Sequence, residues 1–150
     1  MTRRRQLRYE VGQILMLMTR DFQQRLDADL AARGVRGVGA RHRSVFLFLG
    51  RNGASRAVDL AQAARIRPQS MMKIVHELEA MGLVERHPDP ADSRAKLIDF
   101  TEGGRAFIDE LSQSTETVWR QYAAILGERV AVQTFDNLNQ LLAAGDAKRD

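Results

Sequence analysis

The fold is decided by residues 67–87, RPQSMMKIVHELEAMGLVERH. Pro68 suits the first turn of a helix and Gly82 suits a helix end, so this stretch predicts one helix between them. At 100° per residue, one side of that helix is apolar and is expected to face the core. The residues on that side are Met71, Ile74, Val75, Leu78 and Met81.

The opposite side of this helix carries polar chemistry on Gln69, Met72, Lys73 and His76. A helix fits the major groove of DNA, where Gln can pair with adenine, Lys can donate to guanine or phosphate, and Met can touch a thymine methyl. Arg67 and Ser70 lie at the helix start, where backbone N–H groups favour a phosphate. The alternative is a solvated surface of ordinary composition.

A short hairpin is expected to follow the helix. Residues 83–88 and 95–100 predict two strands, with turn residues at 88–93 and with Ile98 and Phe100 on an apolar face. Asp92 and Arg94 lie two residues apart at its tip. A narrow minor groove attracts Arg, and we expect the Asp92 carboxylate to orient Arg94 by a hydrogen bond. After a helix-turn-helix, such a hairpin indicates a wing.

Helices are expected on both sides of this centre. Two of them cover residues 7–33 and 41–49, and a third is capped by Ser55. A fourth is capped by Thr101 and reaches about residue 125, and the last covers about residues 128–144. Residues 50–53 predict a turn. Residues 45–49 are expected to be largely buried. The core residues expected after Ser55 are Val58, Leu60, Ala61 and Ala64. Arg56, at the start of that helix, is a second candidate for binding phosphate.

The predicted fold class is therefore mainly α with a small β-hairpin wing. A winged helix-turn-helix lobe at about residues 41–100 is flanked by long helices at about 7–33 and 102–144, all within one domain of 150 residues. A first helix of some 27 residues spans about 40 Å, which exceeds the width of a small globule. Both outer helices carry an apolar stripe that a monomer of this length could hardly cover. We therefore expect these helices to form a two-fold homodimer.

Charge is distributed unevenly along the chain. Residues 1–75 hold 15 Lys and Arg against 5 Asp and Glu, whereas residues 76–150 hold 8 against 14. A polyanion is the natural partner of such a basic half. The alternative is a solvated basic face with no binding role. An anionic membrane is not favoured, because no long helix opposes these charges with a broad apolar face.

Other classes of protein lack support in the sequence. No apolar run approaches the roughly 18 residues of a membrane span, so we expect a cytoplasmic protein that does not bind membranes. There is no cysteine. His42, His76 and His87 are not at metal-ligand spacing, and His76-Glu77 lacks the second histidine of a zinc protease motif. We therefore expect no metal, no cofactor and no enzymatic activity.

Three runs together resemble the MarR family of bacterial transcriptional regulators: residues 57–66, AVDLAQAARI; residues 67–87; and residues 89–105, DPADSRAKLIDFTEGGR. The matching elements are Leu60-Ala61, Pro68, Leu78-Glu79, Gly82-Leu83-Val84, Arg86, Asp89, Asp92, Arg94, Thr101 and Gly104-Arg105. Phe100 departs from the pattern, since the family usually has Leu there. The lack of cysteine excludes the oxidant-sensing branch of the family.

The resemblance implies a homodimer that binds a palindromic operator in double-stranded DNA. By position, Gln69, Ser70, Lys73 and His76 would serve on the recognition helix, and Asp92 and Arg94 on the wing. Many members repress genes until a small effector, often aromatic or phenolic, binds between the lobes and the dimer region. The sequence leaves two alternatives open: an architectural DNA-binding protein without base preference, and a winged-helix module that binds protein.

Overall fold

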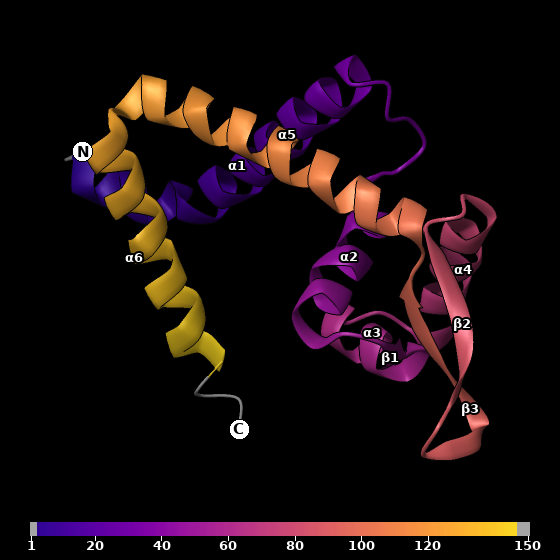
Figure 1. The fold of residues 1–150 in the computed structure, drawn as a ribbon. Coiled ribbons are helices and arrows are strands. Elements are labelled where there is room, and N and C mark those ends of the chain that lie inside the picture. The colour runs from indigo at the N-terminus through magenta and orange to yellow at the C-terminus, as the bar shows by residue number, and fades with distance from the viewer. Residues whose placement is uncertain (1–2, 147–150) are drawn as a thin grey trace.

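Six helices and three strands make up the part of the chain that the structure describes (Figure 1). The structure is a computed structural model that describes residues 3–146. The elements are α1 (Arg3–Ala32), α2 (Ala40–Asn52), β1 (Ser55–Arg56), α3 (Ala57–Ala64), α4 (Pro68–Ala80), β2 (Val84–Asp89), β3 (Asp92–Phe100), α5 (Glu102–Leu126) and α6 (Glu128–Asp146). The predicted fold class is confirmed, because a winged helix-turn-helix lies between long terminal helices.

The long helices α1 and α5 cross and pack against each other in the upper part of the molecule in Figure 1. Polar contacts join them: the Tyr122 hydroxyl donates to Asp21 Oδ2 at 2.8 Å, and Arg25 donates to Gln121 at 2.8 Å. Helix α1 begins at Arg3, four residues before the expected start, because its basic first turn is compatible with a helix.

Three aromatic rings pack where the lobe of α2, α3, α4 and the sheet meets the start of α5, within an apolar core that continues to α1. Phe46 of α2 packs against Phe100 and Phe107, with ring centroids 5.3 and 4.6 Å away. The Phe at position 100 therefore fills the centre of this lobe. As predicted, α4 buries Met71, Ile74, Val75 and Leu78. Met81 does not join them, since it follows the helix end and is 41% exposed.

Three expectations around α2 and α3 are wrong. Residues 50–52 continue α2 instead of forming a turn, because the left-handed position that needs glycine is Gly53, at φ 73°. Ser55 belongs to β1, where its hydroxyl donates to the Gly53 carbonyl, and the N-cap of α3 is Arg56. Leu47 and Val58 are 62% and 55% exposed, because Leu49 and Leu60 occupy the packed faces of these helices.

The wing is longer and tighter than predicted. Strands β2 and β3 pair antiparallel from Val84 opposite Phe100 to Asp89 opposite Asp92, so only two residues separate the strands. Strand β1 adds a third, two-residue strand in the order β1-β3-β2. The register shifts between Pro88 and Asp89. Because proline has no N–H to donate to the ladder, it is tolerated at such an irregularity.

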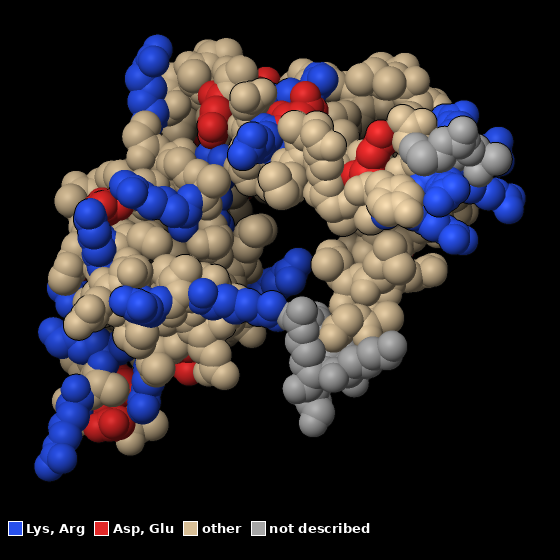
Figure 2. Space-filling view, turned by 180° about the vertical axis from the view of Figure 1, so that it is seen from behind, with Lys and Arg blue, Asp and Glu red and all other residues tan. Residues whose placement is uncertain are grey.

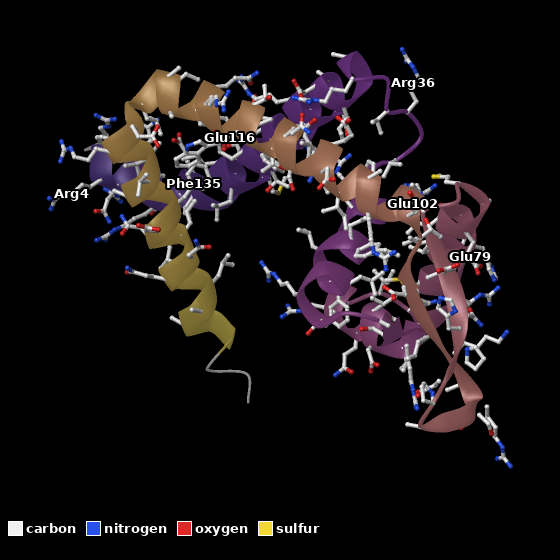
Figure 3. All side chains as sticks on the ribbon, viewed as in Figure 1. Arg4, Arg36, Glu79, Glu102, Glu116 and Phe135 are labelled. Carbon is white, nitrogen blue, oxygen red and sulfur yellow. The ribbon has the colours of Figure 1, made fainter. Side chains whose placement is uncertain are left out.

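A threonine joins the wing to α5. Thr101 caps α5 as predicted, since its Oγ1 accepts the Gly104 N–H at 3.0 Å, and the same hydroxyl donates to the Gly82 carbonyl. Helix α5 ends before Gly127, and α6 turns back (Figure 1). Phe135 of α6, labelled in Figure 3, packs on α5, with its ring 5.5 Å from that of Trp119.

The terminal helices leave much of their apolar surface uncovered. The exposed apolar residues of α1 are Leu7, Tyr9, Val11, Ile14, Leu15, Met16, Leu17 and Met18. Those at the end of α5 and on α6 are Ile125, Leu126, Val130, Val132, Leu141 and Leu142. Despite this apolar content, no helix within residues 3–146 is long and apolar enough to cross a membrane.

Candidate nucleic-acid interface

Helix α4 presents the polar face that the sequence predicts. Gln69, Ser70, Lys73 and His76 are exposed, and Met72 is half-buried between them. The buried apolar face on the other side fixes which residues point outward. Arg67 is the N-cap residue and is exposed, and Pro68 occupies the first turn. The N–H groups of this first turn have no intrahelical acceptor, so this end of the helix favours an anion.

The wing carries exposed positive charge beyond the helix. Arg94 and Lys96 are both exposed on β3, and Arg94 makes no ion pair with any residue that the structure describes. Figure 2 shows Lys and Arg projecting from the half of the molecule that holds the lobe and the wing. A free guanidinium at the tip of a narrow hairpin is suited to a phosphate or a minor groove.

Asp92 does not orient the Arg94 side chain as expected. Its Oδ1 instead accepts the backbone N–H of Arg94 at 3.0 Å, an interaction that shapes the turn and leaves the guanidinium free. The physical reason is proximity. The short Asp92 side chain reaches the backbone N–H two residues ahead more readily than it reaches the guanidinium at the end of the Arg94 side chain.

Arg56 is committed to the wing. Its Nε donates to Asp89 Oδ2 at 2.7 Å, and its terminal nitrogen lies 3.8 Å from Asp92. Asp89 also accepts the Ala91 N–H at 2.9 Å. The Ala91 N–H and then the Arg56 guanidinium hold the pKa of Asp89 below its ordinary value. Arg56 thus ties the base of the wing to the start of α3, and phosphate binding would compete with this pair.

The sequence placed Asp89 in the turn and among the family-matching residues, but it did not predict that Asp89 holds Arg56. A local signal did exist, because an aspartate at the start of a tight turn commonly accepts the backbone N–H two residues ahead. Its partner Arg56, however, lies 33 residues away in the sequence. Among the described residues no cluster of three metal-ligating side chains occurs.

Replacing Asp89 by Ala should lower the Tm by a few degrees at pH 7, because Arg56 and the Ala91 N–H lose their acceptor. The pKa of Asp89 is depressed, so its contribution is present above its ordinary pKa of 3.8 and is lost as the pH falls through the folded value. The Tm difference between wild type and variant should be constant from pH 7 to about 5 and shrink below about 4. Asp136→Ala, an exposed aspartate on α6, is the control. An equal loss of Tm in the two variants would contradict the proposed role of Asp89 in holding Arg56.

These features define a winged-helix DNA-binding protein, and comparison with known proteins identifies its family. The MarR family model matches residues 36–95. An uncharacterised helix-turn-helix transcriptional regulator of Mycobacterium bovis is 30% identical over 103 residues, which are 69% of this chain and 67% of that protein. The chain belongs to the MarR family of transcriptional regulators.

Other relatives agree with this assignment. The transcriptional repressor NicR of Pseudomonas putida is 31% identical over 83 residues, which are 54% of this chain and 52% of NicR. The crystal structure of apo MarR from E. coli covers 87% of this chain and 95% of its own, with a TM-score of 0.73 and 19% identity, which shows the shared fold. The protein is therefore a DNA-binding transcriptional regulator and not an enzyme.

Proposed function

We propose that this protein is a homodimeric repressor that binds an inverted repeat in double-stranded DNA and is released by a small molecule. The observation that carries the proposal is the exposed polar face of α4 beside a wing whose tip carries Arg94, which forms no ion pair within residues 3–146. In this arrangement Gln69, Met72, Lys73 and His76 contact base edges. Arg67 and Ser70 contact phosphate, and Arg94, positioned by the Asp92 turn, enters the minor groove.

Repression through a dimer is supported by the apolar side chains that one copy leaves exposed on α1, α5 and α6. Contiguous exposed apolar surface on a protein of this size marks an interaction site. A second copy is its natural occupant, because a two-fold dimer places two recognition helices about one turn of DNA apart. The name of the relative NicR describes that protein as a repressor, which supports the same sign of regulation here.

The experiment that tests this function begins with a random pool of DNA duplexes, from which the wild-type protein enriches its preferred sequence, here called the selected duplex. Repression through a specific operator predicts an inverted repeat that binds at least a thousandfold more tightly than a scrambled duplex at physiological salt. Little discrimination combined with a steep salt dependence would instead favour an architectural DNA-binding protein.

Arg94→Ala should weaken binding to the selected duplex by about tenfold to a hundredfold, because one wing contact is lost from each half-site. Fluorescence anisotropy at fixed salt measures the effect. Arg120→Ala is the matched control, since it also removes one positive charge, from an exposed arginine on α5 that pairs with Glu116. If the two variants bind equally well, the wing has no special role.

A cavity between α1, α2 and α5 supports the ligand response. It has a volume of about 830 Å³, within the range of small-molecule sites. Its lining combines apolar side chains with Arg43, Gln23 and Trp119, so we propose that it binds a small aromatic or phenolic effector. The chain has a single tryptophan, so Trp119 fluorescence reports occupancy directly. A panel of aromatic acids and phenols should contain compounds that both change this fluorescence and release the selected duplex.

A further inference from the structure

A buried histidine connects α2 to the helix that faces DNA. His42 is 3% exposed, and its Nδ1 accepts the Gly39 N–H at 3.0 Å. Its Nε2 lies 2.8 Å from Glu77 Oε2. Because a carboxylate accepts hydrogen bonds and Nδ1 is already an acceptor, the proton lies on Nε2 and is donated to Glu77. The imidazole thus joins the loop before α2, the first turn of α2 and α4.

Glu77 lies next to the residues proposed to contact bases. It follows His76 directly and is one helical turn from Lys73. The Arg41 guanidinium also binds its carboxylate, at 2.9 Å. The hydrogen bond from His42 and the positive charge of Arg41 lower the pKa of Glu77, so the carboxylate stays ionised. Two groups of α2 therefore hold one carboxylate of α4.

The first turn of α2 is itself firmly anchored. Arg43 is 5% exposed and donates to Asp27 of α1 at 2.7 Å, to the Val38 carbonyl at 3.1 Å and to Gln23. Consecutive residues of this turn thus bind in two directions, Arg43 to α1 and His42 to α4. Because this turn is fixed, the His42 side chain can set the position of the α4 carboxylate to which it is hydrogen-bonded.

We propose that His42 is a positioning residue, which sets the rotation and tilt of α4 through Glu77 without touching DNA. This inference rests on the proposed role of α4 in reading bases. The apolar face of α4 holds the helix against the core of the lobe, but apolar contacts are not directional. A short charge-assisted hydrogen bond to a fixed ring is directional and defines the angle at which the helix leaves the lobe.

The sign of one effect separates positioning from electrostatics. Removing a carboxylate from the DNA-facing helix should strengthen binding to phosphates if charge alone matters. Under the proposal, Glu77→Ala instead weakens binding to the selected duplex by about tenfold. The matched control is Glu79→Ala, since Glu79 lies on the same helix and pairs with Arg86 of the wing at 2.7 Å (Figure 3). That variant should bind more tightly than Glu77→Ala, with an affinity close to that of the wild type.

Three further variants complete the experiment, which measures fluorescence anisotropy at a temperature where circular dichroism shows every variant folded. Glu77→Gln keeps an oxygen that accepts from His42, so it should retain wild-type affinity. His42→Ala should weaken binding about as much as Glu77→Ala, and the double variant should be no weaker than either alone, because both act through one bond. A merely structural role would lower the Tm without reducing the preference for the selected over the scrambled duplex.

Each other outcome overturns the proposal. Glu77→Ala binding as tightly as Glu79→Ala, or additive effects of the His42 and Glu77 variants, would show that the bond does not position α4. If Lys73→Ala weakens binding while the His42 and Glu77 variants do not, the role of α4 stands and only the positioning claim fails. If the wild type prefers no duplex, the proposed function fails, and this inference fails with it.

Discussion

The double substitution Leu141→Glu and Leu142→Glu should convert the protein to a monomer and reduce its affinity for the selected duplex by at least a hundredfold. These leucines of α6 are 70% and 68% exposed in the single chain, so the substitutions leave the fold of one copy intact. Burying one leucine contributes about 1.5–3 kcal/mol, and each dimer would bury four if both residues lie in its interface. Placing charges there adds a desolvation penalty of its own.

The loss of DNA affinity follows from the loss of linkage between two lobes. Joining two binding modules raises affinity by about 10²–10⁴ when both can engage at once. A monomer retains its recognition helix and wing but contacts only one half-site. Each lobe therefore remains intact while the specific complex becomes weak.

Sedimentation equilibrium measures the oligomeric state at micromolar protein concentration. The wild type should have twice the chain mass of 16.9 kDa, and the double variant should have the chain mass. Val58→Glu, a change of similar character at a 55% exposed position on α3, should stay dimeric. A monomeric wild type, or a double variant that remains dimeric, would contradict the role proposed for α6 in dimerisation.

The centre of the fold was predictable because its signals are local. The apolar spacing of Met71, Val75 and Leu78 in α4 depends only on helix periodicity, and the cap at Thr101 depends on residues three positions apart. Gly53 shows the limit of this approach. Two nearby glycines, Gly50 and Gly53, offered a helix end, and the three-dimensional path of the chain selects the one with positive φ.

What the sequence could not reveal depends on contacts between distant residues. Strand β1 has two residues and exists only because β3 lies beside it. The pairs His42–Glu77 and Arg56–Asp89 join positions 35 and 33 residues apart. Arg56 illustrates the consequence: its charge and position suggested phosphate binding, but its partner in the fold holds it to the wing. Composition predicts that a basic residue is present, whereas packing decides what it binds.

Gly104→Ala should destabilise the fold by about 3 kcal/mol or more, because the added methyl group has no room. A Cβ at this position would overlap the Leu83 carbonyl oxygen, and it would lie 3.1 Å from the carbonyl carbon and 3.3 Å from the Phe100 ring. The obstructing atoms are mostly backbone, which cannot rotate away as a flexible side chain can. That same carbonyl accepts the Thr101 N–H, so any retreat of α5 also weakens the start of the helix.

Urea unfolding followed by circular dichroism measures this cost, with all proteins at one concentration because dimerisation would add to the apparent stability. Gly50→Ala is the matched control. It adds the same methyl group within α2, where no atom beyond the adjacent residues and the backbone of the helix itself lies within 4 Å, and should stabilise the protein by about 0.5–1 kcal/mol. Opposite signs for the two substitutions would show that the close approach of α5 to Leu83 is required where the DNA-binding lobe meets the long helices. A Gly104→Ala protein as stable as wild type would mean that this junction can relax, and that the position of the lobe relative to α5 is not fixed by backbone contact.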